Sequence, residues 1–241
     1  MTGPSQASIP RYVGAAFVFQ FCTSLAAGLL SGSMLSSDVG TVIATAGADG
    51  SRLRAVVALE LATSIGIIAL TSLLYVALRA TVRWIATVAF ALWLAEATVL
   101  AVSMLGLYEL LDLGAANLDS GSPLSPSDAA VGRFAVGLHD HAATIGMLLF
   151  CVGALLWYSL FLRTRFVPRW LGIWGLASVA LVAVATLIEV WGGALQPSML
   201  LYVAYVPFEF VVGMWLLARG SRARPTATGT QRSEGLSQGW T

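Results

Sequence analysis

Residues 84–110 read WIATVAFALWLAEATVLAVSMLGLYEL, and this stretch decides the class of fold. Only Glu96 and Glu109 are charged within it, and it contains no proline. A helix needs about 20 such residues to cross the hydrocarbon layer of a membrane, which is about 30 Å thick. Because the apolar residues do not alternate with polar ones, the stretch predicts a membrane helix rather than a strand of a β-barrel.

Other stretches of the chain share this character. The six expected spans are residues 12–35, 54–78, 84–110, 136–162, 170–191 and 198–218. The chain of 241 residues is 58% hydrophobic and only 10% charged, whereas a soluble domain carries about 25% charged residues. A single core cannot bury that much apolar surface, so the remainder must face lipid. The sequence therefore predicts an all-α, polytopic transmembrane helix bundle of about six spans, with the lipid bilayer as its partner. The formal net charge of +1 argues against a nucleic-acid partner.

The arginines predict the orientation of this bundle, because cytoplasmic loops of membrane proteins are enriched in basic residues. One set of connections and flanks carries ten of them: Arg11, Arg79, Arg83, Arg163, Arg165, Arg169, Arg219, Arg222, Arg224 and Arg232. The alternate connections carry three: Arg52, Arg54 and Arg133. We therefore expect both termini to be cytoplasmic and the protein to lie in the plasma membrane.

Polar segments lie outside the expected spans. The chain divides into an N-terminal tail (1–10), a membrane domain (11–218) and an Arg-, Ser- and Gly-rich cytoplasmic tail (219–241). We expect the last of these to be disordered. Residues 112–128 form a polar outer connection, whose final part, Ser125-Pro126-Ser127-Asp128, is typical of a helix start with Ser125 as N-cap and Pro126 at the first helical position.

Ionisable side chains inside the expected spans mark where function is to be sought, because a charge at mid-bilayer costs about 2.5–3.5 kcal/mol on insertion scales. These residues are Glu60, Glu96, Glu109, His139, Asp140, His141, Glu189 and Glu209. With the expected topology, all of them fall in the outer half of the membrane or at its midplane. This asymmetry is the most informative feature of the sequence.

Three hypotheses account for the asymmetry. The groups line an outward-facing polar cavity for ligand binding or acid–base chemistry, or they hold a metal ion, or they hydrogen-bond between helices. The metal hypothesis is the weakest, because residues two apart point about 200° apart around a helix, so His139 and His141 cannot face one site. No H-E-x-x-H motif or comparable ligand spacing is present either. We therefore assign no metal site.

The sixth expected span has a further feature. Pro207 lies two residues before Glu209, removes a backbone donor and frees the carbonyl of Val203, which predicts a kink. Tyr202 and Tyr205 lie seven and four residues before Glu209, on about the same helical face. Such a helix can line a pocket, or it can serve ordinary interhelical contact.

These considerations select the candidate residues. The candidate catalytic residues are Glu96, His139, Asp140 and Glu209. The candidate ligand-binding residues are Glu60, Glu96, His139, Glu189, Tyr202, Tyr205 and Glu209. We expect aromatic residues near the ends of the spans to form belts at the membrane interfaces: Trp157, Tyr158, Trp170, Trp174 and Trp191. No motif names a cofactor.

A basic connection between the expected fourth and fifth spans carries a resemblance. Residues 163–172 read RTRFVPRWLG, a basic loop that ends in Pro-Arg-x-Leu-Gly. The second span opens with Arg52-Leu53-Arg54-Ala55, the third contains the run Leu94 to Ala97, and a histidine, His139 or His141, lies near the start of the fourth. In this order the motifs resemble a bacterial membrane-protein family catalogued only as domain of unknown function 4386. The likeness covers about residues 10–218, and it implies a six-span fold but no activity.

The sequence leaves three functions open. The first is a non-catalytic polytopic membrane protein that binds a small hydrophobic molecule or a lipid, since no nucleophile–base–orienter triplet is recognisable. The second is an intramembrane enzyme that uses buried carboxyl groups for acid–base chemistry on a lipid or isoprenoid. The third is a proton-coupled transporter, for which we would expect acids in both halves of the membrane and broken helices.

Overall fold

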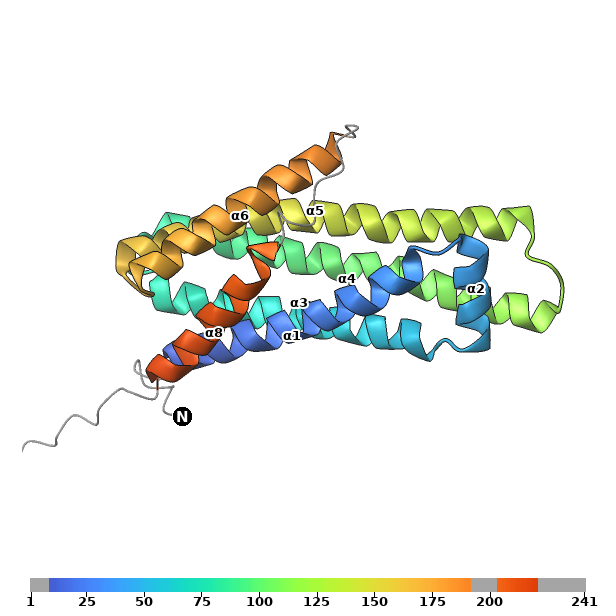
Figure 1. Ribbon diagram of the computed structural model, residues 1–241, viewed down its shortest axis with the longest axis horizontal. Coiled ribbons are helices and arrows are strands. Elements are labelled where there is room, and N and C mark those ends of the chain that lie inside the picture. The colour runs from blue at the N-terminus through green and yellow to red at the C-terminus, as the bar shows by residue number, and fades with distance from the viewer. Residues whose placement is uncertain (1–8, 192–202, 221–241) are drawn as a thin grey trace, which may run out of the picture.

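The computed structural model describes residues 9–191 and 203–220, and all its regular elements in these ranges are helices (Figure 1). They are α1 (Ile9–Leu35), α2 (Val39–Ala48), α3 (Ser51–Leu78), α4 (Arg83–Ser120), α5 (Pro126–Thr164), α6 (Arg169–Val190) and α8 (Val206–Gly220). Among the described residues, five helices are long and apolar enough to cross a membrane, namely α1, α3, α4, α5 and α6. The predicted class, an all-α polytopic membrane protein, is confirmed.

The ends of the chain are described only in part. The helix that begins the bundle starts at Ile9, two residues before the expected boundary of the membrane domain. The sixth expected span, 198–218, begins outside the described residues, and its later part forms α8, whose 15 residues rise about 22 Å. Residues 219–220 belong to α8 rather than to the tail. Residues 1–8 and 221–241, and with them the predicted tails, lie outside the described ranges.

Two connections, α1 to α3 and α4 to α5, contain more helix than the sequence predicted. The first, between α1 and α3, holds α2. The second was expected to be a polar loop over 112–128, but α4 continues to Ser120 and ends at Gly121, whose φ of 60° is left-handed. At 38 and 39 residues, α4 and α5 are each about 57 Å long, which is almost twice the hydrocarbon thickness. In this part of the bundle α2 packs against both helices, and residues of all three share the second apolar core.

The predicted helix start at Ser125 is confirmed. The Ser125 side chain accepts a hydrogen bond from the Asp128 amide at 3.1 Å and donates one to the Asp128 carboxylate at 2.7 Å. Pro126 is the first residue of α5, where its missing N–H leaves no helical partner unsatisfied. This reciprocal cap begins α5 ten residues before the expected span at 136.

The helices form two connected layers around two apolar cores. α1 packs against α3 and α8, while α5 packs against α4 and α6, and α3 contacts α4. The first core lies towards the α5–α6 turn and contains large aromatic side chains such as Trp157, Phe161 and Phe208. The second lies at the end that carries α2 and contains Ile43, Leu107 and their neighbours. We call the first end, where α3 meets α4 and α5 meets α6, the arginine-rich end, and the other the α2 end (Figure 1).

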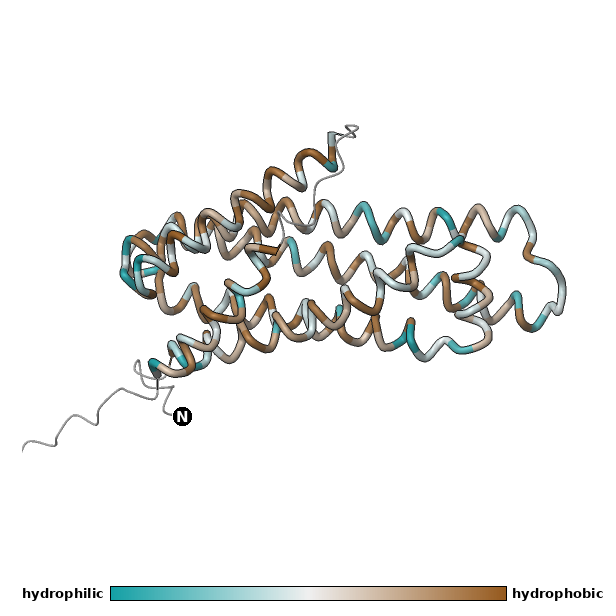
Figure 2. The backbone as a smooth tube through the Cα atoms, viewed as in Figure 1, coloured by the Kyte–Doolittle hydropathy of each residue, from teal (hydrophilic) through white to brown (hydrophobic). Residues whose placement is uncertain are grey.

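Apolar residues predominate along the helices, and hydrophilic residues are most frequent towards the two ends of the bundle (Figure 2). Large side chains such as Leu29, Ile65 and Phe134 are 69%, 57% and 70% exposed. Apolar side chains exposed in this density are suited to contact with lipid. The helical backbone is suited to lipid as well, because its polar groups hydrogen-bond within the helix. The surface therefore agrees with the membrane assignment.

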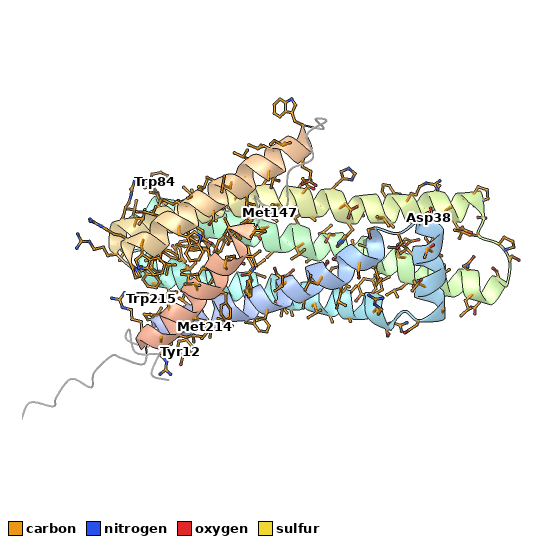
Figure 3. The ribbon with its side chains drawn as sticks, in the orientation of Figure 1. Tyr12, Asp38, Trp84, Met147, Met214 and Trp215 are labelled. Atoms are coloured by element: carbon orange, nitrogen blue, oxygen red, sulfur yellow. The ribbon has the colours of Figure 1, made fainter. Side chains whose placement is uncertain are left out.

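The aromatic residues expected in belts at the membrane interfaces differ in exposure. Trp170 and Trp191 are exposed near helix ends, and Trp84 and Trp215 lie at the arginine-rich end, opposite Asp38 at the α2 end (Figure 3). Trp157 and Tyr158, however, are completely buried, so their predicted place in a belt is wrong. The reason is tertiary: Phe208 of α8 packs edge-on against the Tyr158 ring and covers the position.

The connection from α5 to α6 has an unusual backbone. Arg165 follows α5 with a φ of 53°, in the left-handed region, which costs a residue with a Cβ about 1–2 kcal/mol. The Phe166 amide donates to the Phe161 carbonyl at 3.1 Å, and the two rings lie 5.5 Å apart. Together these contacts form a Schellman-type helix end, in which glycine is the usual left-handed residue.

Candidate functional site

A cavity of about 390 Å³ lies within the bundle, between the two apolar cores. Every long helix contributes to its wall: α1, α3, α4, α5, α6 and α8. Its apolar lining includes Phe21, Leu25, Ile67, Leu100, Met147 and Phe150. The cavity is thus large enough for a small molecule and mostly apolar, as ligand sites usually are.

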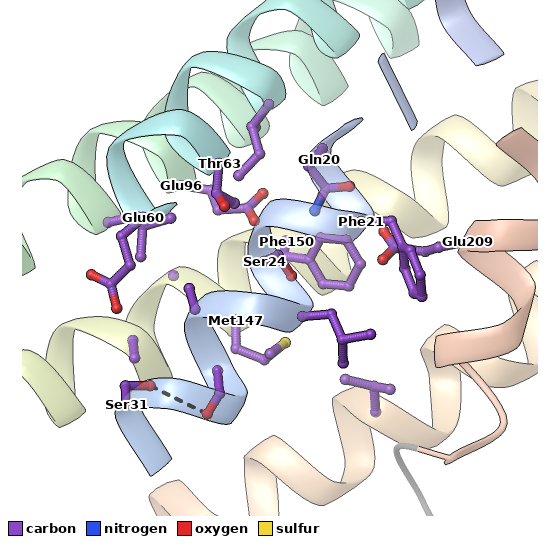
Figure 4. Close-up of a pocket in the computed structure, with 18 of the residues that line it drawn as sticks. Gln20, Phe21, Ser24, Ser31, Glu60, Thr63, Glu96, Met147, Phe150 and Glu209 are labelled. Carbon is purple, nitrogen blue, oxygen red and sulfur yellow. Dashed lines mark hydrogen bonds between the residues drawn. The ribbon is translucent and has the colours of Figure 1, made fainter. Parts of the chain in front are cut away.

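Five of the candidate residues line this one cavity. They are Glu60 from α3, Glu96 from α4, His139 from α5, and Tyr205 and Glu209 from the last described segment. Figure 4 shows Glu60 and Glu209 at opposite sides of the group, with Glu96 between them. Residues separated by up to 149 positions in the sequence, from Glu60 to Glu209, are therefore brought to one place by the fold.

Glu60 and His139 form a buried pair. The His139 Nε2 and Glu60 Oε1 atoms lie 3.5 Å apart, and each residue is only 6% exposed. Its neighbour in the sequence, Asp140, is exposed, and His141 is exposed with its ring bonded to the Gly137 carbonyl. As the helical geometry requires, only one of the two histidines faces the cavity.

Tyr158, Tyr205 and Glu209 form a directed chain of hydrogen bonds. Tyr205 donates to Glu209 Oε1 at 2.7 Å, and the two tyrosine hydroxyls lie 2.9 Å apart. Because a hydroxyl carries one hydrogen, Tyr158 must be the donor to Tyr205. The chain begins in the first apolar core, where Tyr158 is buried, and ends at a carboxyl group on the cavity wall.

The predicted kink near Pro207 takes the form of an interruption. A turn at Ala204 and Tyr205 separates Val203 from α8, and Pro207 falls in the first turn of that helix. A proline is tolerated at this position, where amides have no helical acceptor. The Ala204 carbonyl accepts a hydrogen bond from the Trp174 indole of α6 at 3.1 Å. Tyr205, in this turn, and Glu209, in the first turn of α8, both line the cavity.

Several buried polar atoms of the cavity wall lack a partner. Gln20 Oε1, Glu60 Oε2 and Glu96 Oε2 make no hydrogen bond within the described part of the chain. An unsatisfied buried polar group costs about 1–3 kcal/mol, so their grouping in one place calls for a function. All three belong to residues that line the cavity, as does His139, whose Nδ1 also makes no hydrogen bond within the described residues.

The remaining candidates are not part of the cavity wall. Asp140 is exposed and does not line the cavity. Glu189 is exposed near the end of α6 and accepts a hydrogen bond of 3.4 Å from Thr144. Tyr202 lies outside the described residues.

The fold also adds residues that sequence reasoning missed. Gln20 lines the cavity from α1, together with Ser24 and Ser31, and Thr63 does so from α3. Gln20 carried a usable signal, because it is the only amide side chain in the apolar run of the first span. Tyr158 carried none, since nothing in the sequence indicates its contact with Tyr205.

The electrostatic character of the cavity is acidic. Three carboxyl groups line it, and among its described lining residues only His139 can carry a positive charge. No group of three or more His, Cys, Asp or Glu side chains within the described ranges gathers closely enough to hold a metal ion. The arrangement can accept hydrogen bonds, or positive charge, from a ligand of otherwise apolar shape.

These features define the class of the protein: an all-helical, polytopic membrane protein with an acid-lined cavity between two apolar cores. The family model described as Domain of unknown function (DUF4386) matches residues 12–220, and the chain belongs to this family. The predicted resemblance is thereby confirmed. No curated protein and no solved structure matches the chain.

Proposed function

We propose that this protein binds a lipid-soluble small molecule in the acid-lined cavity, and that the head group of the ligand is an amine or another strong hydrogen-bond donor. The observation that carries the proposal is the set of three unpartnered oxygens on Gln20, Glu60 and Glu96, all in the wall of one cavity. Each of these oxygens can accept a hydrogen bond, and an amine or ammonium group supplies up to three donors.

The charge of the wall favours a cationic ligand over an anionic one. A carboxylate or phosphate would meet no arginine among the described lining residues, whereas an ammonium group would stabilise the ionised form of Glu60, Glu96 or Glu209. A positive head group would neutralise one of these acids in a site of low polarity, where a charge without a partner is costly. The apolar wall, with Phe21, Met147 and Phe150, suits an aliphatic or aromatic body.

The lining residues at the rim support access from the bilayer. Leu25 and Gly28 of α1, Ala143 of α5 and Val206 of α8 all line the cavity and are all exposed. The rim therefore lies between the α1–α3–α8 layer and the α4–α5–α6 layer, on a surface that faces lipid. A ligand dissolved in the membrane can reach the acids without crossing an aqueous phase.

The test compares two probes with the same tail, dodecylamine and dodecanoic acid. The full chain is placed in phosphatidylcholine nanodiscs, and bound probe is counted by native mass spectrometry or with a radiolabel. We expect saturable binding of one amine per chain, about tenfold or more tighter than the acid, which corresponds to about 1.4 kcal/mol or more. The paired substitution Glu96→Gln and Glu209→Gln should remove most of this preference.

A matched control is available on the same helix. Glu109 is a glutamate of α4 that is exposed and does not line the cavity, so Glu109→Gln should leave amine binding unchanged. Equal binding of amine and acid by a folded protein would contradict the proposal. An equal loss of binding in Glu109→Gln would contradict it as well, because it would point to general surface charge.

A second candidate, proton-coupled transport of the same kind of ligand, is favoured by one observation. The helix interruption at Ala204 and Tyr205 is of the type from which transporter sites are built, and the Tyr158–Tyr205–Glu209 chain ends beside it. Transport predicts that dodecylamine drives proton movement across proteoliposomes, and that Glu209→Gln abolishes it. Binding without proton movement would contradict transport and would leave ligand binding as the function that the data support.

A further inference from the structure

A second cavity of about 390 Å³ lies at the arginine-rich end of the bundle and shares no lining residue with the acid-lined cavity. Its lining residues are Arg165, Val167, Pro168, Arg169, Trp215 and Arg219. They come from the α5–α6 connection, the start of α6 and the end of α8. Three guanidinium groups thus surround one hollow that no described carboxylate lines.

We infer that this cavity binds a phosphate-bearing anion, as the head group of an anionic lipid or as a free phosphate ester. Guanidinium groups match phosphate geometry with paired hydrogen bonds. None of the three arginines takes part in an ion pair within the described part of the chain, where the only pair is between Glu60 and His139. Their charges are therefore available to a ligand.

One of these arginines is held in place before any ligand arrives. Arg219 Nη1 donates to the Phe166 carbonyl at 3.1 Å, and its guanidinium carbon lies 5.0 Å from the centre of the Trp215 ring. These two contacts hold the Arg219 side chain, at the end of α8, against the α5–α6 connection. A pre-positioned guanidinium loses less conformational entropy on binding.

The backbone of Arg165 is a separate indication. This residue occupies the left-handed position of a Schellman-type helix end, with a φ of 53°, where glycine would fit without strain. Its side chain nevertheless lines the cavity. A strained backbone that presents a charged group to a hollow is typical of a functional position.

The beginning of α6 adds a weaker attraction of the same sign. Its N-cap is Pro168, which offers no side-chain cap, so the first amides and the helix dipole face the same region as Arg169. Trp170 is exposed nearby, and Trp215 lines the cavity, which fits the depth of lipid head groups. Basic pockets between helices at this depth suit anionic head groups.

The test uses the full chain and three substitutions. Native mass spectrometry counts retained phosphatidic acid against phosphatidylcholine of the same tails, and a thermal-shift assay measures the response to inorganic phosphate. The variants are Arg165→Gly, Arg169→Gln and, as a control, Arg163→Gln; Arg163 lies in the last turn of α5, is exposed and does not line the cavity.

We expect the wild-type chain to retain one phosphatidic acid, and Arg165→Gly and Arg169→Gln each to reduce this about tenfold. Arg165→Gly should do so without any fall in melting temperature, because glycine relieves the left-handed backbone. Arg163→Gln should bind as the wild type does. A purely structural role for Arg165 would not produce this combination.

The outcomes also separate the two sources of phosphate. Retention of the lipid without a response to millimolar inorganic phosphate supports the site and assigns it to a lipid head group. A thermal shift with inorganic phosphate that Arg169→Gln abolishes supports the site for a free phosphate group. No preference for phosphatidic acid together with no shift, or an equal loss in Arg163→Gln, would overturn the inference. The residues differ from those of the acid-lined cavity, so neither result depends on the proposed function.

Discussion

Tyr205 occupies the middle of the hydrogen-bonded chain, where it donates to Glu209 and accepts from Tyr158. Tyr205→Phe strands a carboxyl oxygen and a hydroxyl in a buried place, so we expect a loss of about 1–3 kcal/mol in the free energy of unfolding. Tyr158→Phe removes only the last donor and leaves the bond to Glu209 intact, so it should cost less. Unfolding of each variant in detergent measures the difference.

The order of these two effects is the informative result. Tyr12 is 51% exposed, and Tyr12→Phe should change stability by no more than about 0.5 kcal/mol. If Tyr158→Phe proved as costly as Tyr205→Phe, the direction assigned to the chain would be wrong.

Glu60 and His139 are the second residue-scale test. Their side chains lie 3.5 Å apart in a buried place, so they should be energetically coupled. We expect a double-mutant cycle of Glu60→Gln and His139→Ala to give a coupling energy of about 0.5–3 kcal/mol. The same cycle with His141→Ala, an exposed histidine two residues away, should give a coupling energy near zero. Additivity in the first cycle would show that the pair does not interact.

At the scale of elements, α1 meets α8 through a glycine. A Cβ on Gly14 would lie 2.6 Å from the Leu217 amide nitrogen and 2.7 Å from the Gly213 carbonyl oxygen. Gly14→Ala should therefore force the two helices apart and destabilise the fold by about 1–3 kcal/mol.

The matched substitution lies in the same helix. A Cβ on Gly32 would meet nothing within 4 Å, so Gly32→Ala should be neutral or should stabilise α1 by up to about 1 kcal/mol. Chemical denaturation in detergent compares the two variants. Equal effects would contradict the close approach of α1 and α8.

The short connection between α2 and α3 gives an element-scale pH dependence. The Asp49 carboxylate accepts hydrogen bonds from the Ser51 side chain and from the Ser51 backbone amide, the second at 3.0 Å. These bonds hold the pKa of Asp49 below its usual range. A lowered native pKa contributes stability at pH values above the unfolded pKa of about 4, and this contribution is lost as the pH falls through the native pKa. Ser51→Ala should raise the Asp49 midpoint in an NMR titration, and an unchanged midpoint would contradict the hydroxyl's part in the effect.

The elements themselves were largely predictable, because long apolar runs leave few alternatives inside a membrane. The expected spans at 54–78 and 170–191 agree closely with α3 and α6. The extension of α4 to Ser120 was not predictable. It depends on α2, whose close approach through Gly47 and Gly114 is a tertiary contact that no local pattern reveals.

At the scale of the whole molecule, the sequence indicated which residues gather but not how they face. Glu60, Glu96, His139, Tyr205 and Glu209 could be selected because each is polar within an apolar span, and all five line one cavity. Glu189 met the same criterion but is exposed, since α6 diverges from the bundle towards its end (Figure 1). The rotation of a helix about its axis, and its departure from its neighbours, depend on partners distant in the sequence.

The depth of the acids follows from the lengths of the helices. Glu96 lies 13 residues from the start of α4 at Arg83, or about 20 Å along the helix. Glu209 lies 11 residues from the end of α8 at Gly220, or about 16 Å. A hydrocarbon layer about 30 Å thick that starts at the arginine-rich end therefore contains both carboxyl groups well inside it. With that placement the Glu96 and Glu209 carboxyl groups of the cavity wall lie within the lipid layer, which is why we propose a lipid-soluble ligand.

The measurement that tests this central claim most directly is photolabelling with a dodecylamine that carries a diazirine on its tail. Wild-type protein in nanodiscs is compared with Gly146→Phe, because Gly146 lines the cavity and a Cβ there meets nothing within 4 Å. In the wild type we predict labels on lining residues such as Leu25, Met147 and Phe150. In Gly146→Phe, which should remain folded, we predict about tenfold fewer labels on these residues. Labels confined to lipid-facing residues such as Ile65, unchanged by the substitution, would contradict the account.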